Sequence, residues 1–174
     1  MTRRVAIVLL TVVLSGCPTP APSSTPAGSA KIVHIIDGDT VVLEVGGARE
    51  TTRLLGIDTP ETHHPTRPVE CFGVEATERL AELLPVGSTV RVERDVEARD
   101  HYDRLLLYIH LPDDQGLANL VMVADGYATA LHVAPNDAHR RAIADAEAEA
   151  RRAGRGLWGT CGGPGVAIDP LHSR

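Results

Sequence analysis

Aromatic residues are scarce in this chain of 174 residues, which has one Phe, one Trp and three Tyr. Binding on rows of aromatic platforms needs more rings than this, so that mode of binding is disfavoured. The core must therefore be aliphatic. With 43% hydrophobic and 23% charged residues, the chain can form one compact domain, and a largely disordered chain is excluded.

Lysine is almost absent, since Lys31 is the only one and arginine supplies the remaining positive charge. The 17 basic residues are outnumbered by 23 acidic residues, which gives a formal net charge of -6. This balance argues against a protein that coats nucleic acid through a broad basic surface. The composition does not exclude a local basic site, because a guanidinium group makes two-pronged contacts with phosphate or carboxylate.

The apolar run over residues 5–14 is too short to span a bilayer as a permanent helix. It follows Arg3 and Arg4, and this pattern is typical of an export signal. The next residues, LSGC, resemble a bacterial lipobox, which predicts cleavage before Cys17 and a lipid on its thiol. The alternative is an uncleaved N-terminal anchor. Both interpretations place the domain at the cell envelope, facing the periplasm or the exterior.

Cysteine is also sparse, and besides Cys17 the chain has only Cys71 and Cys161. There is no C-x-x-C motif, so a zinc knuckle is not expected. An even pair in an oxidising compartment predicts one disulfide, with two unpaired buried thiols as the alternative.

Composition divides the chain into four segments. Residues 1–16 form the signal peptide, and residues 17–30 form a lipidated cysteine with a Pro/Ser-rich tether that has no apolar periodicity. Residues 31–161 form the folded domain, and residues 162–174 are expected to form a flexible tail. We expect a monomer. Removal of Arg3 and Arg4 would leave 15 basic against 23 acidic residues, a net charge of -8.

Short β-rich runs alternate with turn residues after Lys31, which predicts a β-meander followed by further strands. Apolar spacing and stop signals predict three helices, the last capped by Asn136. The expected strands cover residues 31–36, 41–45, 48–57, 89–96 and 104–110, and the expected helices cover residues 74–84, 117–125 and 136–153. This is an α+β protein, and a five-stranded OB-fold β-barrel with three helices is the leading architecture.

Polar groups gather at three turns or strand ends. The DGDT turn places Asp37, Asp39 and Thr40 around a glycine, a set of hard oxygen donors that calcium prefers, although DG is also an ordinary hairpin turn. In the second segment Asp58 could join Asp39 at one cation, with Glu61 as an acceptor for a water proton.

Arginines complete this set of polar groups. Arg53 precedes Asp58, and Arg104 follows the turn that contains Tyr102. The alternative is structural, with Arg53 paired to a glutamate and Glu61 a solvated loop charge. Attack of water on a phosphodiester gathers charge on its equatorial oxygens, which cations and guanidinium groups stabilise. An acidic cage, two arginines and one spare carboxylate match that need.

These motifs resemble the thermonuclease, or staphylococcal-nuclease-like, family. The likeness lies in IIDGDTV, RLLGIDTPET, the Tyr102 and Arg104 pair, NLVMVADGYA and GLWG, in the family's order and spacing. It extends from Lys31 to about Cys161 and implies the family's OB-fold barrel with three helices.

The resemblance implies a role for each matching residue. Asp39 and Asp58 would give carboxylates to one Ca²⁺, with the Thr59 backbone carbonyl as a further ligand. Asp37 and Thr40 would support these ligands without touching the ion.

The same resemblance implies the catalytic groups. Glu61 would be the general base toward the attacking water. Arg53 and Arg104 would clamp the phosphate, with Arg104 also assisting the leaving 5′ oxygen, and Tyr102 would contact the substrate. The implied products are 3′-phosphate ends.

Three features depart from the family pattern. Asp103 stands where many members have glycine, which adopts a left-handed turn more readily. The segment LHVAPND carries His132 and no aromatic residue, so stacking on the nucleotide base should be weaker. The acidic net charge should also recruit long polyanions poorly.

From the motifs and the resemblance together, we predict a lipid-anchored, calcium-dependent nuclease for DNA and RNA. The alternative is a non-catalytic OB-fold envelope lipoprotein that binds oligonucleotides or another partner.

Overall fold

The computed structural model describes residues 28–62 and 68–168 of the chain. The predicted signal peptide, Cys17 and the first part of the predicted tether lie outside the described residues, as do residues 169–174. None of the helices in the described parts is long and apolar enough to cross a membrane.

Five strands close into a barrel in the order β1-β2-β3-β6-β5. Neighbouring strands are antiparallel, except that β3 and β6 are parallel. The strands are β1 (Gly28–Ile35), β2 (Thr40–Val45), β3 (Ala48–Leu54), β5 (Thr89–Glu93) and β6 (Leu105–Ile109). The predicted α+β fold with a five-stranded OB-like barrel is therefore confirmed.

The strand predicted over residues 48–57 is interrupted, which corrects the sequence-based prediction. β3 ends at Leu54, and Gly56 has a φ of 80° that a residue with a side chain rarely adopts. A Cβ at Gly56 would also lie 2.6 Å from Ile143 Cδ1. After this bend β4 (Ile57–Asp58) leaves the barrel and pairs with β7 (Thr129–Ala130), which carries Asp58 to the edge of the barrel.

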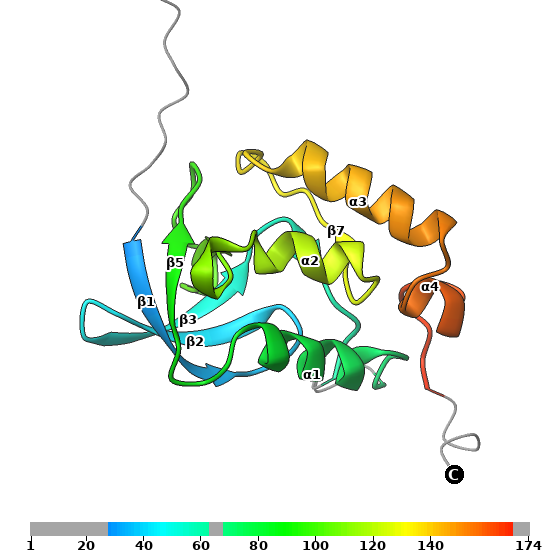
Figure 1. The fold of residues 1–174 in the computed structure, drawn as a ribbon, viewed down its shortest axis with the longest axis horizontal. Coiled ribbons are helices and arrows are strands. Elements are labelled where there is room, and N and C mark those ends of the chain that lie inside the picture. The colour runs from blue at the N-terminus through cyan, green and yellow to red at the C-terminus, as the bar shows by residue number, and fades with distance from the viewer. Residues whose placement is uncertain (1–27, 63–67, 169–174) are drawn as a thin grey trace, which may run out of the picture.

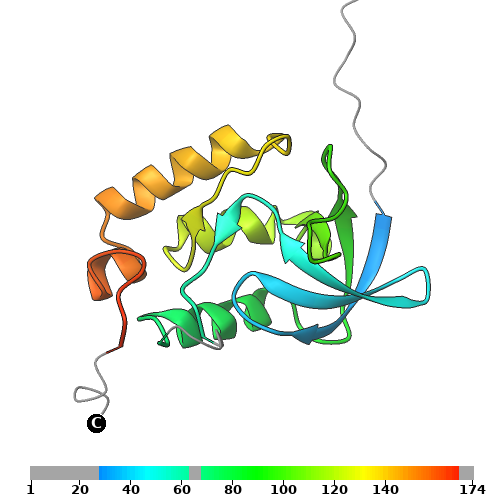
Figure 2. The same ribbon diagram turned by 180° about the vertical axis from the view of Figure 1, so that it is seen from behind.

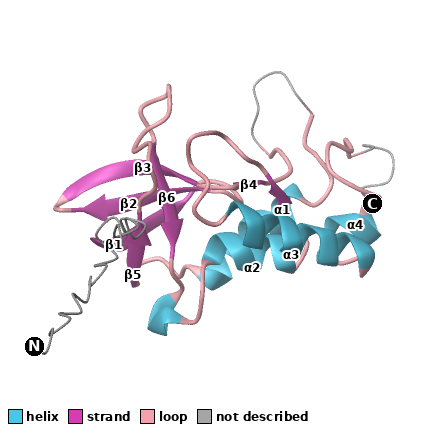
Figure 3. Ribbon diagram, turned by 90° about the horizontal axis from the view of Figure 1, so that it is seen from above, coloured by secondary structure: helices cyan, strands magenta, loops and turns pink. Residues whose placement is uncertain are grey.

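Helices cover one side of the barrel (Figure 3). They are α1 (Gly73–Leu83), α2 (Ala118–Ala124), α3 (Arg140–Arg152) and the short α4 (Leu157–Thr160), with a 3₁₀ turn at Pro112–Asp114. Figure 1 shows α2 between α1 and α3, and both helices contact it. The three predicted helices are confirmed as α1, α2 and α3.

The predicted Asn136 cap is wrong. The third long helix begins at Arg140, and its first turn has no side-chain cap. Asn136 is buried instead, where its Oδ1 accepts a hydrogen bond from the Glu97 N–H at 2.8 Å. A tertiary contact has therefore replaced the local capping role that the sequence suggested.

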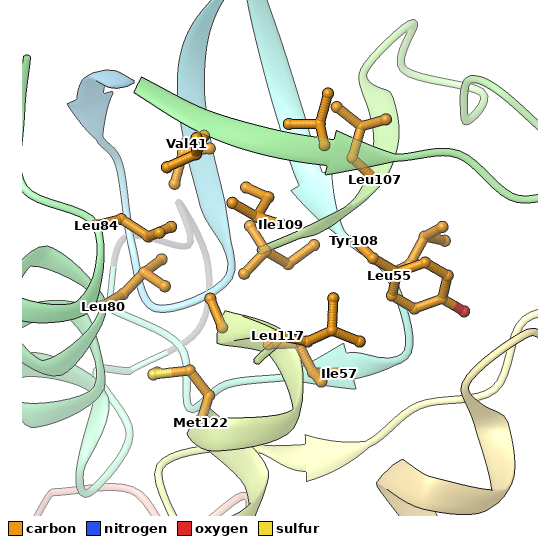
Figure 4. Close-up of a cluster of buried hydrophobic side chains, with 14 of the residues drawn as sticks. Val41, Leu55, Ile57, Leu80, Leu84, Leu107, Tyr108, Ile109, Leu117 and Met122 are labelled. Carbon is orange, nitrogen blue, oxygen red and sulfur yellow. The ribbon is translucent and has the colours of Figure 1, made fainter. Parts of the chain in front are cut away.

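The core lies inside the barrel and between the barrel and the helices, and it is mainly aliphatic, with the ring of Tyr108 also buried in it. Figure 4 shows Leu80 and Met122 from two helices near Ile109 of β6. The buried Asn119 of α2 links this region to the barrel, because its Nδ2 donates to the Leu55 carbonyl at 2.8 Å and its Oδ1 accepts from the Ile109 N–H at 3.0 Å. These bonds fix the end of β3, where the polar site begins.

Hydrogen-bonded structure extends beyond both predicted ends of the folded domain. β1 begins at Gly28, within the predicted tether, and pairs with β5 from that residue. At the other end, the Ile168 N–H donates to the Val69 carbonyl at 3.0 Å, so part of the predicted flexible tail is paired. Figures 1 and 2 both show this segment running from α4 past the start of α1.

Candidate active site

The DGDT turn between β1 and β2 is held by its own backbone and by close packing. Its second acid, Asp39, donates its backbone N–H to Asp37 Oδ1 at 3.0 Å. Gly38 has no room for a side chain, since a Cβ there would lie 2.9 Å from both Ala76 Cβ and Thr59 Cγ2. The glycine therefore lets the turn pack against α1 and against the Asp58-Thr59 segment.

Asp39 is a buried carboxylate whose oxygens are both engaged. Its side chain is only 4% exposed. The Thr59 N–H and hydroxyl each donate to its Oδ2 at 2.9 Å, and the Thr40 hydroxyl donates to its Oδ1 at 3.0 Å. Through these bonds Thr40 and Thr59 fix the orientation of the carboxylate.

Arg53 joins the two carboxylates that were predicted to share a cation. It forms ion pairs with Asp39 and with Asp58, the latter at 2.6 Å between Nη2 and Oδ1. Its Nη2 also donates to the Ile57 carbonyl at 3.0 Å. Arg53 therefore pairs with two aspartates rather than with a glutamate, the partner that the structural alternative required.

Arg104 lies directly before β6, the strand that pairs with β3. Its Nε donates to Asp100 Oδ2 at 2.7 Å, and its backbone N–H donates to Asp100 Oδ1 at 2.9 Å. Partial burial raises the pKa of Asp100, but the bonds from Arg104 lower it below its usual range. Asp100 was not predicted from the sequence, although its spacing of four residues from Arg104 across a tight turn is a usable signal.

The predicted catalytic and metal-binding residues converge on one cavity of about 120 Å³. Its lining comprises Asp37, Asp39, Thr40, Arg53, Asp58, Thr59, Pro60, Glu61 and Arg104. Partial burial raises the pKa of Asp37, although Thr40 and Arg53 oppose that effect. The cavity therefore combines several carboxylates with two guanidinium groups in one small polar space.

A second cavity of about 360 Å³ adjoins the first, because Arg53 and Arg104 line both. Aliphatic residues such as Leu131 and Val133 contribute to its lining. Tyr102 lines neither of these cavities. It is 70% exposed, with its ring 3.7 Å from that of His101 and the Arg104 guanidinium 5.4 Å from its centroid. Its contact with substrate stays a prediction.

Glu61 lies in the loop after β4. Its Oε1 accepts a hydrogen bond from the Thr62 N–H at 3.0 Å. Its backbone is bonded to Glu70, which sequence reasoning did not single out because the two residues are nine positions apart in an irregular segment. The carboxylate nevertheless lines the same cavity as Asp39 and both arginines.

Asp103 occupies a left-handed turn, as the comparison with family glycines suggested, with a φ of 65°. Its carboxylate lies 3.6 Å from Arg99 Nε, and its carbonyl accepts from Arg99 Nη1 at 2.7 Å. These contacts direct its charge toward Arg99, whereas Arg104 is paired with Asp100.

The donor set at the cavity fits a hard divalent cation. No group of three or more His, Cys, Asp or Glu side chains arranged to hold a metal occurs within residues 28–62 and 68–168. Asp39 and Asp58 nevertheless contact the same guanidinium, so their Oδ1 atoms converge on one positive charge. Carboxylate oxygens supplemented by backbone carbonyls are the ligands that calcium takes in proteins. The resemblance implies the Thr59 carbonyl as a backbone ligand, and the structure places Thr59 next to Asp39, whose carboxylate accepts bonds from the Thr59 N–H and hydroxyl.

Comparison with known proteins identifies the family. A family model described as staphylococcal nuclease homologue matches residues 51–160. The chain belongs to the staphylococcal nuclease family. It is 36% identical over 127 residues to a thermonuclease of Staphylococcus intermedius, across 73% of this chain and 74% of that protein.

Two further relatives agree with this assignment to the staphylococcal nuclease family. A thermonuclease of Staphylococcus hyicus is 32% identical over 128 residues, covering 74% of each chain. Endonuclease YncB of Bacillus subtilis is 33% identical over 129 residues, covering 73% of this chain and 60% of that protein. The family match includes Arg53, Glu61 and Arg104 but begins after the DGDT turn.

Proposed function

We propose that the protein is a calcium-dependent nuclease that hydrolyses phosphodiester bonds in DNA and RNA and leaves 3′-phosphate ends. The observation that carries this proposal is the convergence of Asp39, Asp58, Glu61 and two arginines on one cavity of about 120 Å³. Membership of a nuclease family supports the reaction class. The proposed calcium dependence rests on the oxygen donors at the cavity, and the proposed 3′-phosphate ends rest on the resemblance to the thermonuclease family.

The cation would be held by the carboxylates of Asp39 and Asp58 and by the Thr59 carbonyl. When bound, it supplies positive charge to the phosphate oxygens, where negative charge develops during attack. Arg53 pairs with both of these aspartates in the structure. With a cation held by the two carboxylates, the Arg53 guanidinium would be available to the phosphate.

Hydrolysis then requires a base, a phosphate clamp and a leaving-group contact. Glu61 accepts a proton from water as the water oxygen forms its bond to phosphorus. Arg53 and Arg104 bind the equatorial oxygens, and Asp100 holds Arg104 through its Nε, which leaves the end of the guanidinium for the substrate. The bond from phosphorus to the 5′ oxygen breaks, and this oxygen, stabilised by Arg104, takes up a proton from solvent water to become a 5′-hydroxyl.

Calcium titrations of two variants separate the metal-binding role from the base. Asp39→Asn should weaken calcium binding, so its activity falls and is partly regained at higher calcium. Glu61→Gln should lower turnover by about 10²-fold or more without that rescue. Asp145→Asn is the matched control, because Asp145 is an exposed residue of α3 with 75% of its side chain accessible. Equal calcium dependence in all three variants would contradict the assignment of Asp39.

We further propose that the protein is exported and anchored to the cell envelope by a lipid on Cys17. The support is the sequence around Cys17, which follows a short apolar segment and resembles a lipobox. Cys17→Ser should abolish labelling by a radioactive fatty acid while nuclease activity is retained. Labelling that persists in this variant would contradict the anchor.

A further inference from the structure

The backbone of Glu61 is clamped from both sides by one other residue. Its N–H donates to Glu70 Oε2 at 3.2 Å, and its carbonyl accepts from the Glu70 N–H at 2.8 Å. Glu70 thus bonds the two peptide units that flank the Glu61 Cα, one through a side-chain atom and one through a backbone atom. Such a pair of bonds fixes both the position and the rotation of the Glu61 backbone, and hence the direction in which its side chain leaves.

Glu70 is itself fixed by the C-terminal segment 161–168. It forms an antiparallel bridge with Ala167, and its neighbour Cys71 donates its N–H to the Val166 carbonyl at 2.7 Å. A disulfide joins Cys71 to Cys161, which directly follows α4. One disulfide and two hydrogen bonds, all at Val69 or Cys71, therefore connect this segment to the neighbours of the residue that clamps Glu61. Figure 1 shows the segment running down from α4 past the start of α1.

The start of α1 packs against the backbone on either side of the Pro60–Glu61 peptide bond. A Cβ at Gly73 would lie 2.9 Å from the Pro60 carbonyl oxygen and 3.2 Å from the Glu61 carbonyl oxygen. The helix therefore packs directly on the peptide units next to Glu61, and it follows Cys71 after a single intervening residue. Contacts on this side leave little room for the Glu61 backbone to shift.

The neighbouring metal-binding candidates are held by different contacts. Asp58 lies in β4, which pairs with β7, and Thr59 is bonded to Asp39. Within the described parts of the chain, neither residue is hydrogen-bonded or strand-paired to Glu70. Loss of the Glu70 clamp should therefore displace Glu61 while Asp58 and Thr59 stay in place.

We propose that Glu70 is a positioning residue for Glu61, and that the Cys71–Cys161 disulfide and the segment 161–168 hold Glu70 in place for that task. This proposal rests on the catalytic role proposed for Glu61. Its consequence is that a bond formed far along the chain controls turnover, while binding of calcium and of substrate does not depend on it. Misplacement of a reacting group by about 1 Å can cost about a hundredfold in rate.

Steady-state kinetics of Glu70 variants test the side-chain bond. Glu70→Ala should lower kcat by about tenfold or more, with KM for DNA and the calcium midpoint unchanged. Glu70→Gln keeps a side-chain carbonyl oxygen and should restore most of the turnover. Glu78→Ala is the matched control, since Glu78 is an exposed glutamate of α1, and it should have wild-type kcat. Wild-type kcat in Glu70→Ala would overturn the proposal.

Combination with Glu61→Gln shows whether Glu70 acts through Glu61. Glu70→Ala and Cys161→Ser should each lower kcat in the wild-type background and cause no further loss in the Glu61→Gln background. Circular dichroism at the assay temperature ensures that the rates refer to folded protein. Equal fold-losses in both backgrounds would overturn the positioning role. Wild-type turnover in Glu61→Gln itself would instead contradict the proposed function, whatever Glu70 does.

Discussion

Arg53 shows how a single side chain can serve two purposes at this site. Two aspartates placed near one another repel, and the buried one, Asp39, has little access to water. The guanidinium of Arg53 contacts both carboxylates at once and offsets that repulsion. The same planar group can form a two-pronged contact with a phosphate.

Replacement of Arg53 by lysine should therefore be severe. An ammonium group is a point charge and cannot contact both aspartates, or two phosphate oxygens, in the geometry of a guanidinium. We expect Arg53→Lys to lower kcat by about 10²-fold, the scale for loss of a positioned donor in an active site. Arg141→Lys provides the control, because Arg141 is 97% exposed on α3. Near wild-type kcat in Arg53→Lys would show that charge alone is sufficient there.

At the scale of elements, a cluster outside the active site joins the barrel to α3. Glu93 of β5 accepts bonds from His110 Nε2 and from His139 Nε2, both at 2.9 Å. Arg91 contacts the same cluster through His110 Nδ1 at 2.7 Å, and the Tyr108 ring packs edge-on against His139. One carboxylate therefore connects the barrel to the residue directly before the first turn of α3.

This cluster predicts part of the acid sensitivity of the fold. Partial burial raises the pKa of Glu93, but the bonds from His139 and His110 outweigh that effect and lower it below its ordinary value of 4.5. The folded state then binds the proton more weakly than the unfolded state. Its contribution to stability is complete above that ordinary value and is lost as the pH falls through the lower folded pKa.

Urea unfolding at a series of pH values measures this contribution. Glu93→Gln should be less stable than wild type near neutral pH, and its stability should fall less steeply below about pH 4.5. Glu75→Gln, an exposed glutamate in the first turn of α1, is the control and should follow the wild-type curve. Parallel curves for wild type and Glu93→Gln would contradict the linkage.

Several elements could be predicted from the sequence because their signals are local. Short β-rich runs bounded by turn residues predicted β1 and β2, and the acids and arginines of the site lie next to turns that the sequence marks clearly. The end of β3 could not be predicted, because the β-rich run continues through Gly56 and the bend depends on a close approach of Ile143 from α3. The clamp on Glu61 and the burial of Asn136 also depend on tertiary contacts.

At the scale of the whole molecule, the Cys71–Cys161 disulfide encloses most of the described fold. The two cysteines are 90 residues apart, and the enclosed chain includes α1, the barrel strands β5 and β6, α2 and α3. Closing a loop of this length restricts the unfolded chain and stabilises the fold by about 4 kcal/mol in the chain-entropy model.

Serine variants of both cysteines should therefore have matched effects on stability. Cys71→Ser and Cys161→Ser should lower the melting temperature by similar amounts, and the double variant should be no less stable than either single one, because all three lack the same bond. Thermal unfolding followed by circular dichroism measures this directly. Additive losses would instead indicate two independent thiols.

The molecule has a net charge of -6, and two of its arginines lie together at the active-site cavity. An acidic surface recruits long polyanions weakly, so cleavage depends on the few groups gathered at the cavity rather than on a broad basic face. We propose that the carboxylates and arginines at this cavity, together with calcium, cut phosphodiester bonds.

Digestion of plasmid DNA by the purified protein, with calcium or with a chelator, tests that claim most directly. We expect cleavage with calcium and none with the chelator, and the new ends should accept a labelled nucleotide from a terminal transferase only after a phosphatase has removed the 3′-phosphate. A protein that binds oligonucleotides yet releases no 3′-phosphate ends at any calcium concentration would contradict the account and favour a binding module.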